Sequence, residues 1–447
     1  MGATSIGRPI ISLAERFTAT RRRTLALCKP LTAEDMMVQS CAEASPAKWH
    51  LAHTAWFFES FVLREFIPGY RLFNLDFPWL FNSYYQSFSA IPEKRLRASF
   101  SRPGLEEVLR FREHVARGMD DLFERLAGDQ IEPALAAQAA ERIELGVNHE
   151  EQHQELLLTD ILHAFSTNPL RPAYLPAGFG LGDPGLTAPR TAGIPASSFH
   201  DFPGGIREAG SSGPDFCFDN ERPLHRVWLD PYRLADRMVT CAEYAAFIAD
   251  GGYRRPELWL SAGWDAVRAS GWAAPLYWTD AGKSDGAGSG SDWRIFTLRG
   301  ELPLASLEDT PVSQVSFFEA DAYARWAGLR LPTEFEWEAA AGSQAVIGNL
   351  LDSEHLLPAP AERRAPSSGP AQLFGDCWEW TSSAYLGYPG FKPLPGSLGE
   401  YNGKFMSGQM VLRGGSCVTP AAHIRASYRN FFPPETRWQF SGIRLAR

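Results

Sequence analysis

The stretch from Gly146 to His163 reads GVNHEEQHQELLLTDILH and combines two histidines, four residues apart, with the apolar period of a helix. On a helix this spacing brings His149 and His153 to one face, where both imidazoles can bind a single metal ion. The leucines and the isoleucine that follow continue the apolar stripe, so this face should look into a core. A helix whose histidines merely bond to neighbouring carboxylates would fit the same spacing, so both interpretations stand at this point.

The same letters spell His-Glu-x-x-His, the zinc protease motif, in which Glu150 would act as general base. A second histidine pair, His50 and His53, lies three residues apart in SPAKWHLAHTAWFFESFVL, another amphipathic segment. One histidine of this pair would complete a three-histidine site across two packed helices. That possibility favours such a site over the protease motif.

Composition limits the class of protein. The chain has 447 residues, 45% apolar content and a net charge of -9, which suits two or three domains and shows none of the basic bias of nucleic-acid-binding proteins. It has neither an 18-residue apolar run nor the apolar core of a signal peptide, which predicts a cytoplasmic protein without a membrane partner. The six cysteines form no Cys-x-x-Cys pair, so neither a disulfide framework nor a thiolate zinc site is indicated.

Residues 8–166 have the pattern of helices joined without strands, which predicts an antiparallel four-helix bundle. Metal sites in bundles lie between facing helices, so the second and fourth helices should carry the site. The predicted helices run from Ser12 to Leu27, from the N-cap and first-turn pair Ser45 and Pro46 to about Phe66, from Ser101–Gly104 to beyond Leu122, and onward from Pro133.

Residues 167–215 are rich in proline, glycine, alanine and serine, and we interpret them as a linker and the start of a second domain. Residues 216–447 contain short apolar runs, many tryptophans and two helix-like segments, Cys241–Ala249 and Phe317–Trp326. This pattern predicts an irregular α+β domain with little regular sheet.

Several long motifs in the second half resemble the formylglycine-generating-enzyme, or sulfatase-modifying-factor, domain, a relative of C-type lectin folds. These motifs are PVSQVSFFEADAYARWAGLRLPTEFEWEAAAG, GDCWEWTSSAYLGYPGF, LRGGSC and SGIRLAR. In the first half, WHLAHTAWFFE and NHEEQHQELLLTDIL resemble a DinB-like domain. Both halves together, over about residues 10–447, resemble the ergothioneine sulfoxide synthases of the EgtB type.

This resemblance implies a non-haem Fe(II) held by His53, His149 and His153, with O2 as co-substrate. The implied reaction joins a thiol to C2 of the imidazole of hercynine, which is trimethylated histidine, and oxidises the sulfur. Three histidine ligands leave positions on the metal for O2 and the substrates, which a closed tetrahedral zinc site would not. A zinc hydrolase and a non-catalytic, lectin-like binding module are the alternative classes.

The family uses a tyrosine near the iron to supply a proton or an electron. The NSYY motif assigns this role to Tyr84 and Tyr85, with Tyr385 and Tyr388 of SSAYLGYPGF as the rival pair. Composition alone would favour interface packing for Tyr84 and Tyr85. Three kinds of residue are expected to bind substrate. Some match the residues that the family uses at hercynine, some are aromatic residues whose rings suit a trimethylammonium group, and one is the tyrosine at position 385 in the C-terminal loop. They are Gln152, Asn430, Phe431, Phe432, Trp438 and Tyr385.

One loop departs from the family pattern. Where relatives have a stretch resembling GPRHPRPxRGLLSRP, this chain has SAIPEKRLRASFSRP, with Ile91 and Lys94 at two arginine positions, while Arg97 and Arg102 remain. Isoleucine cannot bind a carboxylate, so Lys94 and Arg97 are the expected donor-binding residues. We therefore predict cysteine as the donor over γ-glutamylcysteine. A selenoneine synthase that couples a selenosugar or a thiosugar to hercynine is the alternative.

Overall fold

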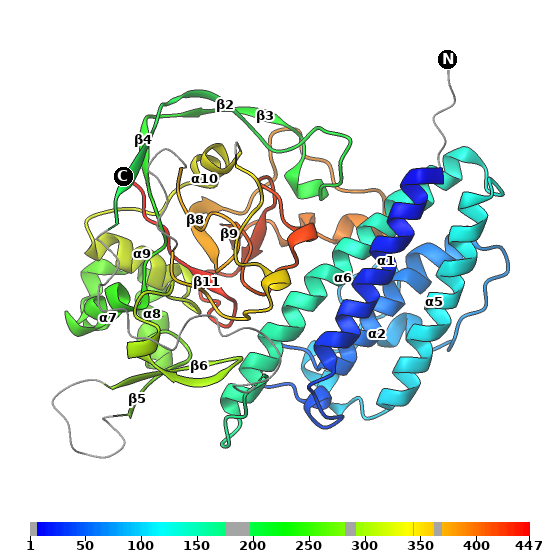
Figure 1. Ribbon diagram of the computed structural model, residues 1–447, viewed down its shortest axis with the longest axis horizontal. Helices are drawn as coiled ribbons and strands as arrows, with labels where there is room; N and C mark the ends of the chain where they lie inside the picture. The colour runs from blue at the N-terminus through cyan, green and yellow to red at the C-terminus, as the bar shows by residue number, and fades with distance from the viewer. Residues whose placement is uncertain (1–6, 176–196, 282–291, 343, 362–368) are drawn as a thin grey trace. The chain divides into compact units, whose positions relative to one another are not determined.

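The computed structural model describes residues 7–175, 197–281, 292–342, 344–361 and 369–447, which form two compact units (Figure 1). The first unit comprises Met1–Thr167 together with Leu394–Tyr401. The second comprises Asn168–Pro393 together with Asn402–Arg447. A short segment from late in the chain therefore belongs to the N-terminal unit.

The first unit is a helical bundle, as predicted. α2 (Ala47–Phe58) continues through a π-helical turn, Glu59–Leu63, into α3 (Arg64–Phe66). A short helix, α4, spans Phe77–Leu80, and 3-10 turns lie at Asp35–Met37, Lys94–Ser99 and Gly396–Glu400. The four long helices of the described residues are α1 (Gly7–Cys28), α2 (Ala47–Phe58), α5 (Leu105–Ala127) and α6 (Pro133–Thr167).

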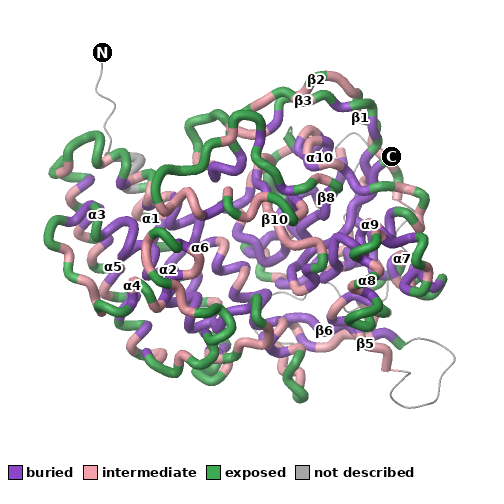
Figure 2. The backbone as a smooth tube through the Cα atoms, turned by 180° about the vertical axis from the view of Figure 1, so that it is seen from behind, coloured by how far each residue is buried: buried purple, intermediate pink, exposed green. Residues whose placement is uncertain are grey.

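Every residue of α2 is buried, because this helix packs against both α5 and α6 (Figure 2). A helix with no exposed face is stable only inside a core, where its few polar side chains need partners. Close approach of α6 requires the glycine at position 146, since a methyl group there would come within 2.6 Å of Phe58 Cε1. Gly146 lies one helical turn before His149, so the tight contact occurs beside the predicted site.

The predicted N-cap of α2 is wrong. The helix begins at Ala47, and the Ser45 side chain caps no amide. Instead, the Ser45 hydroxyl accepts a hydrogen bond from Arg97 Nη1 at 2.7 Å, and its backbone N–H donates to Asp160 Oδ2 at 2.8 Å. Buried tertiary partners have replaced the local cap that the sequence suggested.

The second unit is an irregular α+β domain, as predicted. Its largest sheet has four strands in the order β10-β9-β8-β11, with β11 parallel to β8 and the other pairs antiparallel. The other sheets pair β1 with β4, β2 with β3, and β5, β6 and β7 in sequence. The strands are β1 (Phe199–Phe202), β2 (Gly205–Ala209), β3 (His225–Leu229), β4 (Tyr232–Ala235), β5 (Trp278–Asp280), β6 (Trp293–Thr297), β7 (Gly300–Pro303), β8 (Trp378–Ala384), β9 (Met410–Arg413), β10 (Asn430–Phe432) and β11 (Ser441–Gly442).

Four α-helices cover this unit within the described residues. α7 (Cys241–Ala249) and α9 (Phe317–Trp326) coincide with the two predicted segments. α8 (Ser261–Ser270) and α10 (Glu334–Ala341) were not predicted. The sequence does contain a pattern that predicts the start of α10, because Thr333 and Glu336 form a reciprocal capping box.

Large aromatic side chains and buried ion pairs hold the second unit together. Trp337, Trp378 and Trp380 are at most 1% exposed. Arg444 forms a fully buried pair with Glu379, at 2.8 Å. The part of the predicted linker at 176–196 lies outside the described residues, and the linker boundaries stay a prediction.

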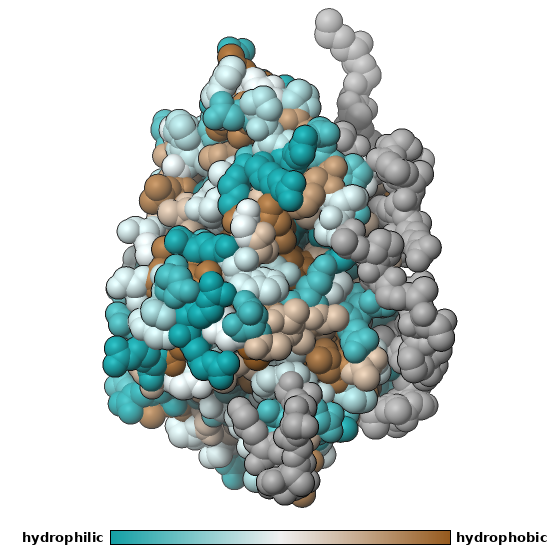
Figure 3. Space-filling view, turned by 90° about the vertical axis from the view of Figure 1, so that its left-hand side faces the viewer, coloured by the Kyte–Doolittle hydropathy of each residue, from teal (hydrophilic) through white to brown (hydrophobic). Residues whose placement is uncertain are grey.

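None of the described helices combines the length and the apolar character needed to span a bilayer. On the face seen in Figure 3, hydrophobic residues are scattered among hydrophilic ones.

Candidate metal centre

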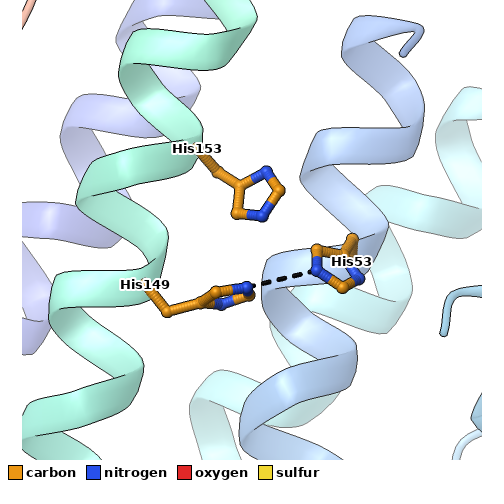
Figure 4. A group of neighbouring side chains, drawn as sticks. All are labelled: His53, His149 and His153. Carbon is orange, nitrogen blue, oxygen red and sulfur yellow. Dashed lines mark hydrogen bonds between the residues drawn. The ribbon is translucent and has the colours of Figure 1, made fainter. Parts of the chain in front are cut away.

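Three histidines from two helices of the first unit meet in its core. α2 carries His53, and α6 carries His149 and His153 one turn apart (Figure 4). One ring nitrogen from each lies within 4.8 Å of the others, and the Nε2 atoms of His53 and His149 are 3.2 Å apart. The side chains are 0%, 1% and 9% exposed, respectively. The three predicted ligands are thus brought together, away from water.

Hydrogen bonds at the outer ring nitrogens determine which nitrogens face the centre. His53 Nδ1 lies 2.6 Å from the carbonyl oxygen of Phe81. Because this oxygen can only accept a hydrogen bond, the proton of neutral His53 lies on Nδ1, and Nε2 of His53 carries a lone pair. His153 Nδ1 lies 2.8 Å from Nδ1 of His50, and Figure 4 shows its other nitrogen turned toward the space between the remaining two rings. His149 Nδ1 is buried and has no hydrogen-bond partner within the part of the chain that the structure describes.

This donor set fits a metal ion. Inward-facing imidazole lone pairs in a dry core repel one another unless a cation or a proton lies between them. Burial lowers the pKa of His149 to about 3 and lowers the pKa of His53 and of His153 well below the usual value, with His149 adding to both of these shifts. The rings therefore stay neutral near pH 7, the form that binds metals.

Aromatic rings fix two of the three imidazoles. Trp49 and Trp56 stack on His53, with ring centroids 4.3 Å and 5.1 Å away and interplanar angles of 14° and 16°. Phe57 stacks on His149 at 4.6 Å. Such packing excludes water and limits rotation of the imidazoles, which prepares the site for a ligand before it binds.

Glu150, the general base of the zinc protease interpretation, has other partners. Its two carboxylate oxygens accept hydrogen bonds from Arg112 at 2.8 Å, Thr24 at 2.7 Å and Arg21 at 3.0 Å. Burial by itself would raise the pKa of Glu150, but Arg21 and Arg112 outweigh it and lower this pKa to about 2. Glu151 also accepts from an arginine of α1, at 2.9 Å. A carboxylate with a pKa this low and with both oxygens bonded is a weak proton acceptor near pH 7.

A cluster of tyrosines lies beside the histidines. Tyr85 is fully buried, with its ring 4.6 Å from that of Tyr84, which in turn lies 6.0 Å from the ring of Tyr401. Tyr401 contacts one of the three histidines: its ring centroid is 5.8 Å from that of His149, and its hydroxyl donates to Gln152 Oε1. Tyr401 was not among the predicted residues, because no local pattern indicates that residues 394–401 join the bundle.

The two expected donor-binding cations differ in setting. Arg97 is 5% exposed, its guanidinium carbon lies 3.5 Å from the ring centroid of Trp49, and burial lowers its pKa to about 9. Lys94 begins a 3-10 helix and is exposed. Ile91 is half-buried. Arg97 therefore packs on the face of Trp49, the ring that stacks on His53, whereas Lys94 is the more accessible of the two cations.

The remaining expected substrate residues lie in the second unit. Asn430, Phe431 and Phe432 form β10, which pairs with β9. Phe431 stacks on Tyr385, with ring centroids 4.0 Å apart and an interplanar angle of 12°. The hydroxyl of Tyr388 is bonded within a buried network of arginine and glutamate side chains, at 2.9 Å and 3.2 Å. This network occupies the hydroxyl that the rival catalytic role would need.

Comparison with known proteins agrees with this two-part organisation. The family described as Sulfatase-modifying factor enzyme 1-like domain matches residues 194–447, and the DinB superfamily matches residues 16–157. The chain is 34% identical over 465 residues to "Hercynine oxygenase" of Mycolicibacterium thermoresistibile, covering 97% of this chain and 94% of the relative. It is 31% identical over 463 residues to "Hercynine oxygenase" of Mycolicibacterium smegmatis, covering 97% and 98%. It is also 31% identical over 288 residues to "Formylglycine-generating enzyme" of Streptomyces coelicolor, covering 55% and 87%.

Proposed function

Since this chain belongs to the hercynine oxygenase family, we propose that it is an Fe(II)- and O2-dependent enzyme that joins a thiol sulfur to C2 of the hercynine imidazole and oxidises that sulfur. The observation that carries this proposal is the convergence of three neutral, buried histidines from α2 and α6. Formation of this bond removes a hydrogen from C2 and oxidises the sulfur, so the reaction needs a redox-active metal rather than a Lewis acid alone.

Fe(II) would be held by His53, His149 and His153. When bound, it would supply the reduction of O2 that drives the coupling. The protein holds the three imidazoles neutral and excludes water from around them. The partners of Glu150 argue against the alternative of a zinc hydrolase, because both of its carboxylate oxygens are already bonded.

We assign the proton or electron donor to the tyrosine cluster of Tyr84, Tyr85 and Tyr401. A phenol is suited to this role because it can give up a proton and an electron from the same group. The NSYY pair remains our first assignment. Tyr401 is a further candidate, since its ring contacts the ring of His149.

For hercynine, we propose the residues that the family resemblance implies, taken within each unit by itself: Gln152 in the first unit as a polar contact, and in the second unit Asn430 as a polar contact with Phe431 and Phe432 for the trimethylammonium head. This cation has no hydrogen-bond donors, so aromatic faces are the natural receptor. Stacking of Phe431 on Tyr385 holds one ring in a defined orientation, which supports the assignment.

For the donor, we propose cysteine in preference to γ-glutamylcysteine. Ile91 offers no charge, and Arg97 is committed to Trp49 and to the Ser45 hydroxyl, so of the two expected donor-binding cations only Lys94 is exposed. A lysine provides a point charge rather than the planar fork that binds a carboxylate at two points. The same observation supports a selenosugar or a thiosugar, which lacks a carboxylate, as the alternative donor.

The test is anaerobic loading with Fe(II) or Zn(II), followed by addition of O2, hercynine and each donor in turn, with mass analysis of the products. We expect a sulfoxide adduct of hercynine with cysteine, formed by the Fe(II) protein and not by the Zn(II) protein. Equal turnover with zinc, or binding of hercynine without O2 consumption, would reject the proposal.

A further inference from the structure

His50 and Asp160 form a hydrogen-bonded relay that ends on one of the proposed ligands. His50 Nδ1 lies 2.8 Å from His153 Nδ1, and His50 Nε2 lies 3.0 Å from Asp160 Oδ2. His50 is 2% exposed and Asp160 is 7% exposed, so water does not compete for these bonds. The backbone N–H of Ser45 donates to the same carboxylate oxygen, at 2.8 Å, and orients it.

The donor and acceptor of each hydrogen bond can be assigned by starting from the carboxylate of Asp160. A carboxylate oxygen that already accepts from a backbone N–H accepts from His50 as well, so the proton of His50 lies on Nε2. His50 Nδ1 is then a lone pair that accepts from Nδ1–H of His153. The one nitrogen of His153 left to bind a metal is Nε2.

We propose that His50 and Asp160 are positioning residues that fix the tautomer of His153 and increase its strength as a metal ligand. This inference rests on the proposed metal centre and adds to it two residues that do not touch the metal. An imidazole that donates toward a carboxylate gains electron density at its other nitrogen, and such outer partners typically change metal affinity ten- to a hundredfold.

The geometry of the bundle supports the relay. Asp160 lies seven residues after His153 on α6, so the two share one face, and His50 reaches between them from α2. The other two ligands have different outer partners: a backbone carbonyl for His53 and no hydrogen-bond partner for Nδ1 of His149. Only His153, among the three, is coupled to a charged group in this way.

The experiment measures Fe(II) affinity by anaerobic competition with a chelator for wild type, His50→Phe, His50→Gln and Asp160→Asn. Phe fills space without a hydrogen bond, so we expect Fe(II) binding to weaken roughly ten- to a hundredfold. Gln should recover most of the affinity, because its carbonyl can accept from His153 and its amide can donate to Asp160. Asn keeps an acceptor without the charge and should fall between wild type and His50→Phe. Glu151→Gln is the matched control, a buried carboxylate of α6 paired with an arginine, and should keep wild-type affinity.

A second measurement separates positioning from folding. Nitrogen-15 NMR of histidine-labelled, Zn(II)-loaded protein should show His153 bound through Nε2 and His50 protonated on Nε2. Binding through Nδ1 of His153, or wild-type affinity in His50→Phe, would overturn the relay. If the wild-type protein binds no Fe(II), the proposed function fails together with the relay. If wild type binds Fe(II) and every variant binds it equally well, only the relay is rejected.

Discussion

Replacement of Glu150 by glutamine separates the iron oxygenase from the zinc protease interpretation. Glu150 is fully buried between Arg21 and Arg112, and the pair of guanidinium groups lowers its pKa from 4.5 to about 2 against the effect of burial. This difference in pKa corresponds to about 3 kcal/mol of stabilisation at neutral pH. Breaking a buried ion pair from one side costs a similar amount, about 3–5 kcal/mol. We therefore expect Glu150→Gln to lower the free energy of unfolding of the metal-free protein by about 3 kcal/mol.

The pH dependence follows with a defined sign. The pKa of Glu150 is lowered in the folded protein, so its stabilisation is fully present above pH 4.5 and is lost as pH falls toward about 2. Urea unfolding at a series of pH values should show a steeper loss of stability in wild type than in Glu150→Gln over this range. The control is Glu151→Gln, whose partner Arg16 has a side chain that is 27% exposed, and this change should cost about 1 kcal/mol or less.

Turnover decides the outcome of this experiment. With Fe(II) bound, Glu150→Gln should retain coupling of the thiol to hercynine at temperatures where the variant is folded. A loss of kcat of about a hundredfold or more, with unchanged stability, would identify Glu150 as a general base and refute this reasoning.

Three further outcomes are expected. Replacement of His53, His149 or His153 by alanine should abolish stoichiometric Fe(II) binding and turnover. Normal iron content in one of these variants would remove that residue from the site. Tyr85→Phe or Tyr401→Phe should divert turnover from the coupled product toward thiol oxidation to the sulfinate, measured as the product ratio, and an unchanged ratio in both would exclude these two phenols. Ile91→Arg should raise kcat/KM for γ-glutamylcysteine roughly tenfold or more at nearly constant hercynine KM, and no change would show that this loop does not bind the donor.

Local regularity made much of the bundle and its histidines predictable. Helix periodicity is a property of neighbouring residues, so the spacing of His149 and His153 was enough to predict that they share a face. Packing of the two helices would bring one histidine of the His50 and His53 pair to this site, and the choice of His53 came from the family resemblance rather than from the spacing. α7 and α9 were predicted correctly for the same reason, since their boundaries coincide with local signals.

Contacts between distant segments account for what the sequence did not indicate. Tyr401 lies beside His149 because the chain returns to the bundle after most of the second unit is complete, and no spacing in the sequence records that return. Ser45 has the residue type of an N-cap, but Asp160 and Arg97 bind its backbone N–H and hydroxyl instead. The setting of Arg97 likewise depends on its stacking over the Trp49 ring rather than on its charge.

The three imidazoles are held by three different physical means, which explains why the site needs this particular surrounding sequence. His153 is oriented by a relay to a charged carboxylate, and His53 by a backbone carbonyl and two indole rings. His149 Nδ1 has no hydrogen-bond partner among the described residues, so the orientation of this ring depends on its Nε2 contact with His53, on stacking with Phe57 and on the close approach of the two helices that Gly146 allows. Substitution of a polar residue of the relay would weaken the orientation of His153, and a shift of the loop that carries the Phe81 carbonyl would weaken that of His53. A single methyl group added at Gly146 would disturb the orientation of His149. The protein therefore keeps three neutral imidazoles in place in a dry core, where the Nε2 atoms of His53 and His149 lie 3.2 Å apart, and a bound cation would be shared by all three rings.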